Sequence, residues 1–373
     1  MDLGIFTIPL MLFLGLFGAS VATETSEVVF EEFTVPAQWE NGYTSQVVTE
    51  RVADAYQNIN QDARTAKSLK AFGLSHKDTF VAAVGDRLDL KNLVTAARDE
   101  LGMISFKIGG DVVEQGGAML IRVHVNSAEG GLETHFVSGP VDDPEPLFLE
   151  AAMAAMRVTS PYVVASYLYE IELDQGTTNF EPTYRALEQA FARLPAEAHH
   201  WLYNLWGLAL LNDGKPKEAI EEFHNALHLQ PGWPLSIHNW GKALTAQGRY
   251  EEAIETFKGV IANDPRMLRS ARAYAEWSKA ALLLGRLEEA EQVLRKAIKL
   301  DPQSSYVYYR WGQLLEAKGQ LQEAARKYRL ALLFQPKRVI WQSDIDRVGG
   351  SVPPEQAPKL TGQPGGSHLI SAV

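Results

Sequence analysis

The stretch "GKPKEAIEEFHNALHLQP" occupies residues 214–231, and a stretch of the same design returns three times further along the chain. The closing prolines are 34, 37 and 34 residues apart, at Pro231, Pro265, Pro302 and Pro336. The opening glycines keep the same spacing, at Gly214, Gly248, Gly285 and Gly319. A fixed period of this length is typical of a repeat array, in which each unit packs against its neighbours.

Each repeat predicts two helices that approach closely. The first helix carries a small residue directly after a tryptophan, at Gly207, Gly241, Ser278 and Gly312. The second helix carries an alanine and, four residues later, a bulky side chain, in the pairs Ala219/Phe223, Ala253/Phe257, Ala290/Leu294 and Ala324/Tyr328. Small residues let helices come together, and bulky ones fill the space beside them. We expect the glycine to end the first helix in a left-handed turn and the proline to end the second.

This pattern resembles the tetratricopeptide repeat over residues 200–336 in four units, of which the third carries a three-residue insertion. The helical pair at 159–199 resembles a degenerate first repeat, and residues 337–348 are expected to form a capping helix. The resemblance implies an all-α superhelix, an α-solenoid, whose concave groove binds an extended peptide or a partner helix. The tail 349–373 is rich in glycine and proline, a composition typical of disorder.

Residues 24–158 predict an α+β domain. We expect a strand at 28–35, a helix that Thr44 caps, a short strand at 79–84 and a helix at 89–102. Three antiparallel strands follow, joined by glycine-bearing turns, and a helix at 143–158 closes the domain. The order of elements is similar to that of TolB-amino-terminal and FlgO/CsgG-like bacterial envelope domains. That resemblance implies an envelope adaptor and no catalytic residues.

The composition excludes several classes of function. The net charge of −11 argues against a general nucleic-acid role, which requires a basic face. The chain has no cysteine, so disulfides, thiolate nucleophiles and cysteine-based metal sites are excluded.

Residues 3–22 contain no charged side chain and are long enough for one membrane crossing. Two interpretations compete: a retained single-pass anchor, and a signal peptide cleaved after Ser20-Val21-Ala22. A buried helix is the third alternative. Acidic residues follow the segment, with no basic residue before Arg51, so we expect the rest of the chain to be translocated. The predicted location is the bacterial inner membrane with the soluble part in the periplasm, or the periplasm after cleavage.

No catalytic group, cofactor or metal site is predicted. His224 and His228 have a metal-ligand spacing, but they flank core positions and are interpreted as solvated residues of the outer surface. His124 and His135 are placed directly opposite each other if their hairpin turns about residues 129–130, where two imidazoles could sense pH or share a metal. The simpler interpretation is that both histidines lie on a solvated polar face of the sheet. An enzyme is not expected.

The best candidate surface is the groove that the resemblance implies. The residues placed along it are Asn204, His238, Asn239, Lys242, Arg272, Lys279, Tyr306, Tyr309, Arg310 and Gln313. Their basic and aromatic character predicts an acidic peptide as partner. A carboxylate clamp fits only in part, because Leu208 stands where an asparagine is expected.

The sequence therefore predicts an adaptor or scaffold of the cell envelope that works by binding a protein. Two alternatives stay open. One is a ligand- or pH-sensing regulator that acts through the α+β domain. The other is a structural subunit of a larger envelope complex, which exposed apolar residues on the outer face of the solenoid would favour.

Overall fold

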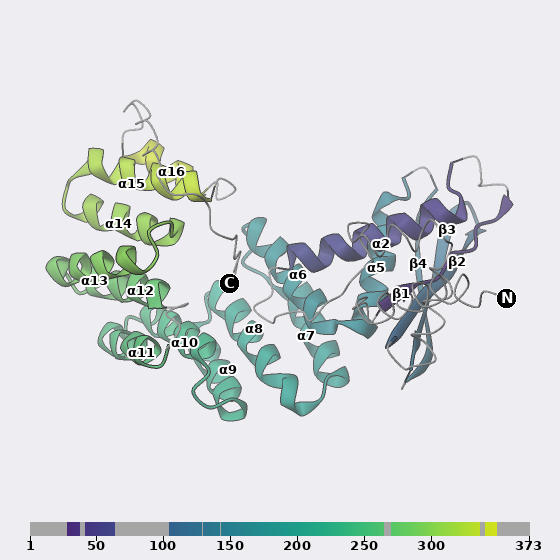
Figure 1. Cartoon of the computed structure of the whole chain (residues 1–373), viewed down its shortest axis with the longest axis horizontal. Helices are drawn as coiled ribbons and strands as arrows, with labels where there is room; N and C mark the ends of the chain where they lie inside the picture. The colour runs from purple at the N-terminus through teal and green to yellow at the C-terminus, as the bar shows by residue number, and fades with distance from the viewer. Residues whose placement is uncertain are drawn as a thin grey trace, which may run out of the picture. The chain divides into compact units, whose positions relative to one another are not determined.

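The computed structural model describes residues 28–37, 42–63, 104–128, 130–141, 143–264, 270–335 and 340–348 (Figure 1). The chain divides into two compact units, one of residues up to Gln175 with Arg185–Arg193, the other of Gly176–Tyr184 and Leu194–Ile370. The segment 3–22, the elements predicted between 79 and 102, and the tail 349–373 lie outside the described residues. Among the residues that are described, no helix has the length and apolar character needed to span a bilayer.

The first unit contains a four-stranded sheet in the order β1-β2-β3-β4. The three long strands form the predicted antiparallel meander: β2 (Phe106–Gln115), β3 (Ala118–Ser127) and β4 (Gly131–Pro140). β1 (Val28–Phe30) pairs with β2 in parallel. Alternation in β3 puts one face in the core, as the sequence predicts, since the buried residues are Met119, Ile121, Val123 and Val125.

Helices cover the sheet from one side. α5 (Glu145–Thr159) packs against β3 and β4, and α2 (Ser45–Asp62) packs against α5. The predicted cap of α2 is present, because the Thr44 hydroxyl accepts a hydrogen bond from the Val47 amide at 3.3 Å.

The next helix, α6 (Pro161–Asp174), packs against α5 and α2. The structure therefore divides after Gln175, and not at the boundary of residue 158 that the sequence suggests. The physical reason is that α6 is apolar around most of its circumference and buries Val163 and Val164 within the first unit. α7 (Glu181–Arg193) contributes residues to both units.

The second unit is built from antiparallel helix pairs, each in contact with the next (Figure 1). A short 3-10 turn at Ala196–Ala198 precedes the first pair. The pairs are α8 (His199–Asn212) with α9 (Pro216–Leu229), α10 (Pro234–Ala246) with α11 (Tyr250–Ala262), α12 (Ser270–Leu283) with α13 (Leu287–Leu300), and α14 (Ser305–Ala317) with α15 (Leu321–Phe334).

Glycines make both the turn and the close approach within a pair. Gly248 has a φ of +79°, and the hydrogen bonds from its amide and the next one close the left-handed helix end that the sequence predicts. Gly241 faces the ring of Phe257, where a Cβ atom would lie only 2.6 Å from a ring carbon. The repeat pattern of small and bulky residues thus corresponds to direct contacts between paired helices.

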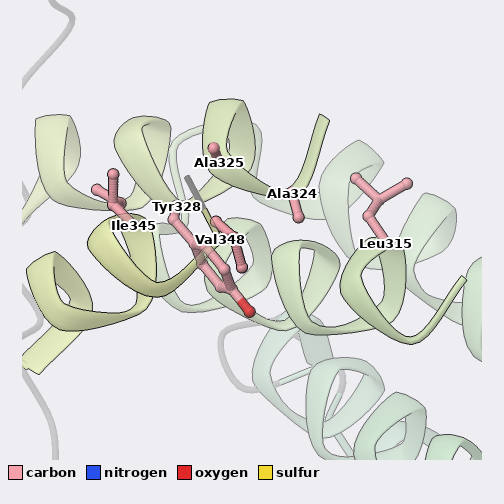
Figure 2. Close-up of a cluster of buried hydrophobic side chains, with 6 residues drawn as sticks. All are labelled: Leu315, Ala324, Ala325, Tyr328, Ile345 and Val348. Carbon is pink, nitrogen blue, oxygen red and sulfur yellow. The ribbon is translucent and has the colours of Figure 1, made fainter. Parts of the chain in front are cut away.

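Helix α16 (Ile340–Arg347) contacts α15 at the end of the second unit. Ile345 and Val348 bury their side chains in one cluster with four residues of the last repeat (Figure 2): Leu315, Ala324, Ala325 and Tyr328. A helix therefore forms where the sequence predicts a capping helix, and it shields the apolar side of α15.

Candidate functional site

The first helices of consecutive repeats are neighbours, since α8 contacts α10, α10 contacts α12 and α12 contacts α14. We call the surface formed by these four helices the first-helix face. The predicted binding residues all belong to it: Asn204 on α8; His238, Asn239 and Lys242 on α10; Arg272 and Lys279 on α12; Tyr306, Tyr309, Arg310 and Gln313 on α14.

Two of the predicted binding residues are buried between helices. Asn204 and Asn239 are 2% and 1% exposed. The Asn204 side-chain oxygen accepts hydrogen bonds from the Ser236 hydroxyl and the Asn239 amide, each at 3.0 Å. Buried polar groups require such partners. These asparagines therefore join α8 to α10 and do not line an open groove, which corrects their predicted placement.

Glu276, on α12, is the residue around which the cations gather. It is 2% exposed, and its carboxylate lies 3.4 Å from the Arg310 guanidinium. The Tyr306 hydroxyl donates a hydrogen bond to the same carboxylate. Arg310 also contacts that hydroxyl, so the three side chains form one buried group. We call Glu276 together with its surrounding residues the Glu276 cluster: Lys242, Arg272, Lys279, Tyr306 and Arg310.

The charges in the Glu276 cluster alter one another's ionisation. Burial alone would raise the pKa of Glu276, but Arg310, Lys242 and Lys279 outweigh it and lower that pKa to about 2. Burial lowers the pKa of Lys242 to about 8; Glu276 opposes this lowering and the neighbouring cations add to it. Burial and Arg310 also lower the pKa of Lys279. A positive potential thus remains after Glu276 is paired.

The aromatic rings of the predicted groove residues contact the protein's own cations. The Arg310 guanidinium lies 4.8 Å from the ring centroid of Tyr306 and 5.8 Å from that of Tyr309. Arg272 lies 5.9 Å from the Tyr306 ring on the other helix. Gln313 accepts a hydrogen bond from Arg310 at 2.8 Å and donates one to Tyr309 at 3.2 Å. These contacts hold Arg310 in place and leave Arg272 exposed.

His238 packs toward the second helix of its own repeat, because its ring centroid lies 5.7 Å from that of Phe257. Its charge is also felt at Glu276, where it lowers the pKa. His238 therefore lies at the edge of the Glu276 cluster.

The sequence interpretation missed Glu276, although a signal for it exists. Glu276 lies two residues before the small residue Ser278, just as Asn239 precedes Gly241 and Arg310 precedes Gly312. The same repeat position therefore presents an amide, a carboxylate and a guanidinium on consecutive first helices. Comparison of that position across repeats would have identified an opposite-charge pair.

The predicted histidine pair of the sheet does not form. Val123 pairs with His135 and His124 pairs with Thr134, one residue away from the expected register. A shift of one residue puts the two imidazoles on opposite faces of the sheet. His124 instead contacts Thr134 at 2.9 Å and Asp111 at 3.4 Å, while His135 lies 3.6 Å from Glu133.

The histidines of α9 behave as expected for the outer surface. His224 is exposed, and its ring packs on Trp240 with the centroids 4.6 Å apart. Within the part of the chain that the structure describes, no three histidine or carboxylate side chains converge in a way that could hold a metal ion.

Comparisons with known proteins agree with the repeat geometry. The tetratricopeptide repeat family model matches residues 238–305 and 277–338. A search of curated protein sequences finds no match.

Among solved structures, a thermophilic repeat protein of Thermus thermophilus, TTC0263, is 18% identical, with 51% of this chain and 97% of that one covered and a TM-score of 0.44. Pseudomonas aeruginosa pilF is 18% identical, with 52% and 89% covered and a TM-score of 0.38. MamA of Desulfovibrio magneticus is 23% identical, with 48% and 98% covered and a TM-score of 0.35. With TM-scores below 0.5, these likenesses identify neither a function nor a partner.

Proposed function

We propose that this protein is a non-catalytic adaptor that binds a segment of a partner protein along α10, α12 and α14, because the tetratricopeptide repeat family model matches residues 238–338. Repeats of this family generally mediate protein–protein interactions. The three first helices follow one another in space and supply a continuous surface for an extended chain or a helix.

The Glu276 cluster is the observation that supports an acidic partner segment. Three cations, Arg310, Lys242 and Lys279, act on the carboxylate of Glu276 in a protein whose net charge is −11. Charges placed in this way steer an oppositely charged partner and fix its position on the face. Arg272 is exposed at the edge of the cluster and is the first cation that an arriving segment would meet.

The envelope location is part of the same proposal. It depends on the uncharged segment 3–22, as a single-pass anchor or a cleaved signal, and on the loose resemblance of residues 24–158 to envelope domains. The sensing alternative has lost its main support, because the register of β3 and β4 separates His124 from His135.

Site-specific photocrosslinking in the source organism tests the proposal. A photoreactive residue at position 272, on the first-helix face, is compared with one at exposed Lys299 on α13. We expect a partner adduct at 272 that is absent at 299. It should disappear in Lys242→Met/Lys279→Met and persist in the matched control Lys217→Met/Lys299→Met, since both control lysines are exposed and lie on second helices. Identical adducts from both positions, or no effect of the cluster variant, would overturn the proposal.

A further inference from the structure

The last strand of the sheet, β4, forms one of its edges. It stands at one end of the order β1-β2-β3-β4, so none of the described strands pairs with its outer side. β4 is ten residues long and pairs with β3 without a bulge. It contains no lysine, and its single proline, Pro140, is its last residue. Lysines, prolines and bulges are the features that usually protect an exposed edge, so β4 is suited to adding another strand.

The turn between β2 and β3 shows which backbone groups of β4 point outward. Its two residues, 116–117, have φ of +63° and +78°, as in a type I′ hairpin. The flanking residues of such a hairpin, Gln115 and Ala118, are a hydrogen-bonded pair, so Ala118 directs its backbone groups toward β2 and away from β4. Alternation along β3 and its register with β4 then give the residues whose N–H and C=O groups point away from β3. These residues are Leu132, Thr134, Phe136 and Ser138.

Two large apolar side chains are exposed on the same strand. Leu132 and Phe136 are 66% and 63% exposed. They point to the face of the sheet opposite the core, because the buried Val123 of β3 pairs with the intervening residue His135. Four residues along a strand span about 13 Å, so these two side chains do not cover each other within one chain.

We infer that β4 pairs with β4 of a second copy of this chain, antiparallel and about a twofold axis at Thr134. A twofold contact is reciprocal, so each residue pair occurs twice. With Thr134 opposite its own equivalent, Leu132 faces Phe136 of the second copy and Glu133 faces His135 of the second copy. Pairs of an aliphatic with an aromatic side chain, of two threonines, and of a carboxylate with an imidazole are all favourable across antiparallel strands.

The other symmetric registers are less complementary. Residues that face each other must point to the same side of the sheet, which limits the axis to a residue of the strand. An axis at Glu133 opposes two carboxylates, and an axis at His135 opposes two imidazoles. An axis at Phe136 places Glu133 against Gly139, which gives the carboxylate no partner. The axis at Thr134 therefore matches both the charges and the apolar side chains.

Glu133 keeps its contacts within the chain in this arrangement. Its carboxylate accepts two hydrogen bonds from the Arg193 guanidinium, at 2.9 and 2.6 Å, and lies 3.6 Å from His135 of the same chain. Arg193 belongs to the same compact unit as the sheet. A carboxylate offers about four acceptor positions, so it can accept a further hydrogen bond from the imidazole of the second copy.

Sedimentation equilibrium of the full chain over a range of concentrations tests the inference. We expect a monomer–dimer equilibrium, which Leu132→Lys/Phe136→Lys should weaken by about tenfold or more, because each lysine then faces a lysine. Leu132→Lys/Phe136→Glu puts opposite charges in the same pairs and should dimerise about tenfold more tightly than the double-lysine variant. The matched control, Leu229→Lys/Leu333→Lys, charges exposed leucines of the second unit and should leave the dimer unchanged. Circular dichroism checks that each variant is folded.

Disulfide formation measures the register. The chain has no cysteine, so any disulfide must come from an introduced one. Facing residues of a hydrogen-bonded pair have Cα atoms about 5.5 Å apart, a separation that a disulfide can span. Thr134→Cys should therefore give a disulfide-linked dimer under mild oxidation. Ser138→Cys, exposed on the same strand but about 27 Å from its equivalent in the second copy, should not.

Several outcomes would overturn the inference. They are a chain that stays monomeric at all concentrations, a dimer with the same dissociation constant in both charged β4 variants, and equal disulfide yields from Thr134→Cys and Ser138→Cys. A monomeric chain whose Thr134→Cys variant forms a mixed disulfide with another protein would assign the edge to a partner strand and would also overturn it. None of these results bears on the adaptor proposal, which concerns α10, α12 and α14.

Discussion

Arg310 and Glu276 face each other from consecutive first helices, 3.4 Å apart, with side chains 10% and 3% exposed. They occupy the same position of two successive repeats, and only the stacking of α12 on α14 brings them into contact. A buried pair of this kind is costly to break, because removal of one partner leaves an unpaired charge. The same two residues therefore contribute both to the stability of the repeats and to the charge of the first-helix face.

Glu276→Gln should destabilise the repeats by about 3 kcal/mol, since Arg310, Lys242 and Lys279 lose the carboxylate that faces them. Urea unfolding followed by circular dichroism measures the change. Glu276→Met/Arg310→Met should recover part of the loss, because Arg310 is no longer left without its carboxylate, whereas Lys242 and Lys279 still lack theirs. Exposed Glu288→Gln is the control and should change stability by less than about 0.5 kcal/mol. A single variant as stable as the parent would contradict the assigned pairing.

Acid should remove the contribution of Glu276 within a defined range. The pKa of this carboxyl is lowered from 4.5 to about 2 in the folded chain. The unfolded chain therefore binds its proton first, and stability falls as pH drops from about 4.5 to 2, by on the order of 3 kcal/mol in total. Urea unfolding from pH 5 to pH 2 measures the slope. Subtraction of the Glu276→Gln profile, in which this component is missing, isolates it from other carboxylates.

Lys242→Met should stabilise the protein by about 1 to 3 kcal/mol at pH 7, because a partly buried ammonium among other cations is replaced by an apolar chain. The sign follows from the lowered pKa of about 8: the folded chain gives up this proton before the unfolded chain does. The parent should therefore gain stability between about pH 8 and 10, and the variant should lack that gain. Lys217→Met is the matched exposed control. A destabilised Lys242→Met would mean that the lysine contributes a stabilising contact.

Gly241→Ala should destabilise the second unit by about 1 to 3 kcal/mol, since its methyl group would lie 2.6 Å from the Phe257 ring. Gly259→Ala, in the second helix of the same repeat, meets nothing within 4 Å and should stabilise the protein by about 0.5 to 1 kcal/mol. Thermal and urea unfolding of the two variants gives the comparison. Equal effects of both substitutions would show that helix propensity, and not helix approach, determines the outcome.

Ile345→Ala should loosen the carboxyl-terminal end of the repeats. Ile345 is 3% exposed and packs in the cluster that includes Tyr328, so its truncation should cost about 2 kcal/mol. Hydrogen exchange should accelerate in α15 and α14 and stay unchanged in α8 and α9. Exposed Asp346→Ala, on the same helix, is the control. Uniform acceleration across all repeats would indicate that the repeats unfold as one cooperative unit.

Local sequence patterns predicted much of the architecture. The meander followed from alternating apolar residues between glycine turns, and the helix pairs followed from the spacing of Gly241 and Phe257 and its equivalents. The register of β3 and β4 did not follow, because a one-residue difference in the turn moves His135 to the other face. The sequence also did not predict that α6 packs in the first unit, because this helix is apolar on more than one side and its pattern does not indicate which neighbour covers it.

The sequence by itself determined the repeats, because a period of 34 residues and recurring small, bulky and helix-ending residues act through contacts within a single helix pair. Only the tertiary structure decided what the charged residues do. Lys242, Glu276 and Arg310 come from three different repeats, and whether each lies in solvent or against another charge depends on how the first helices stack. The energy of a charged group depends on its distance from other charges and on its burial, and neither can be read from the order of residues.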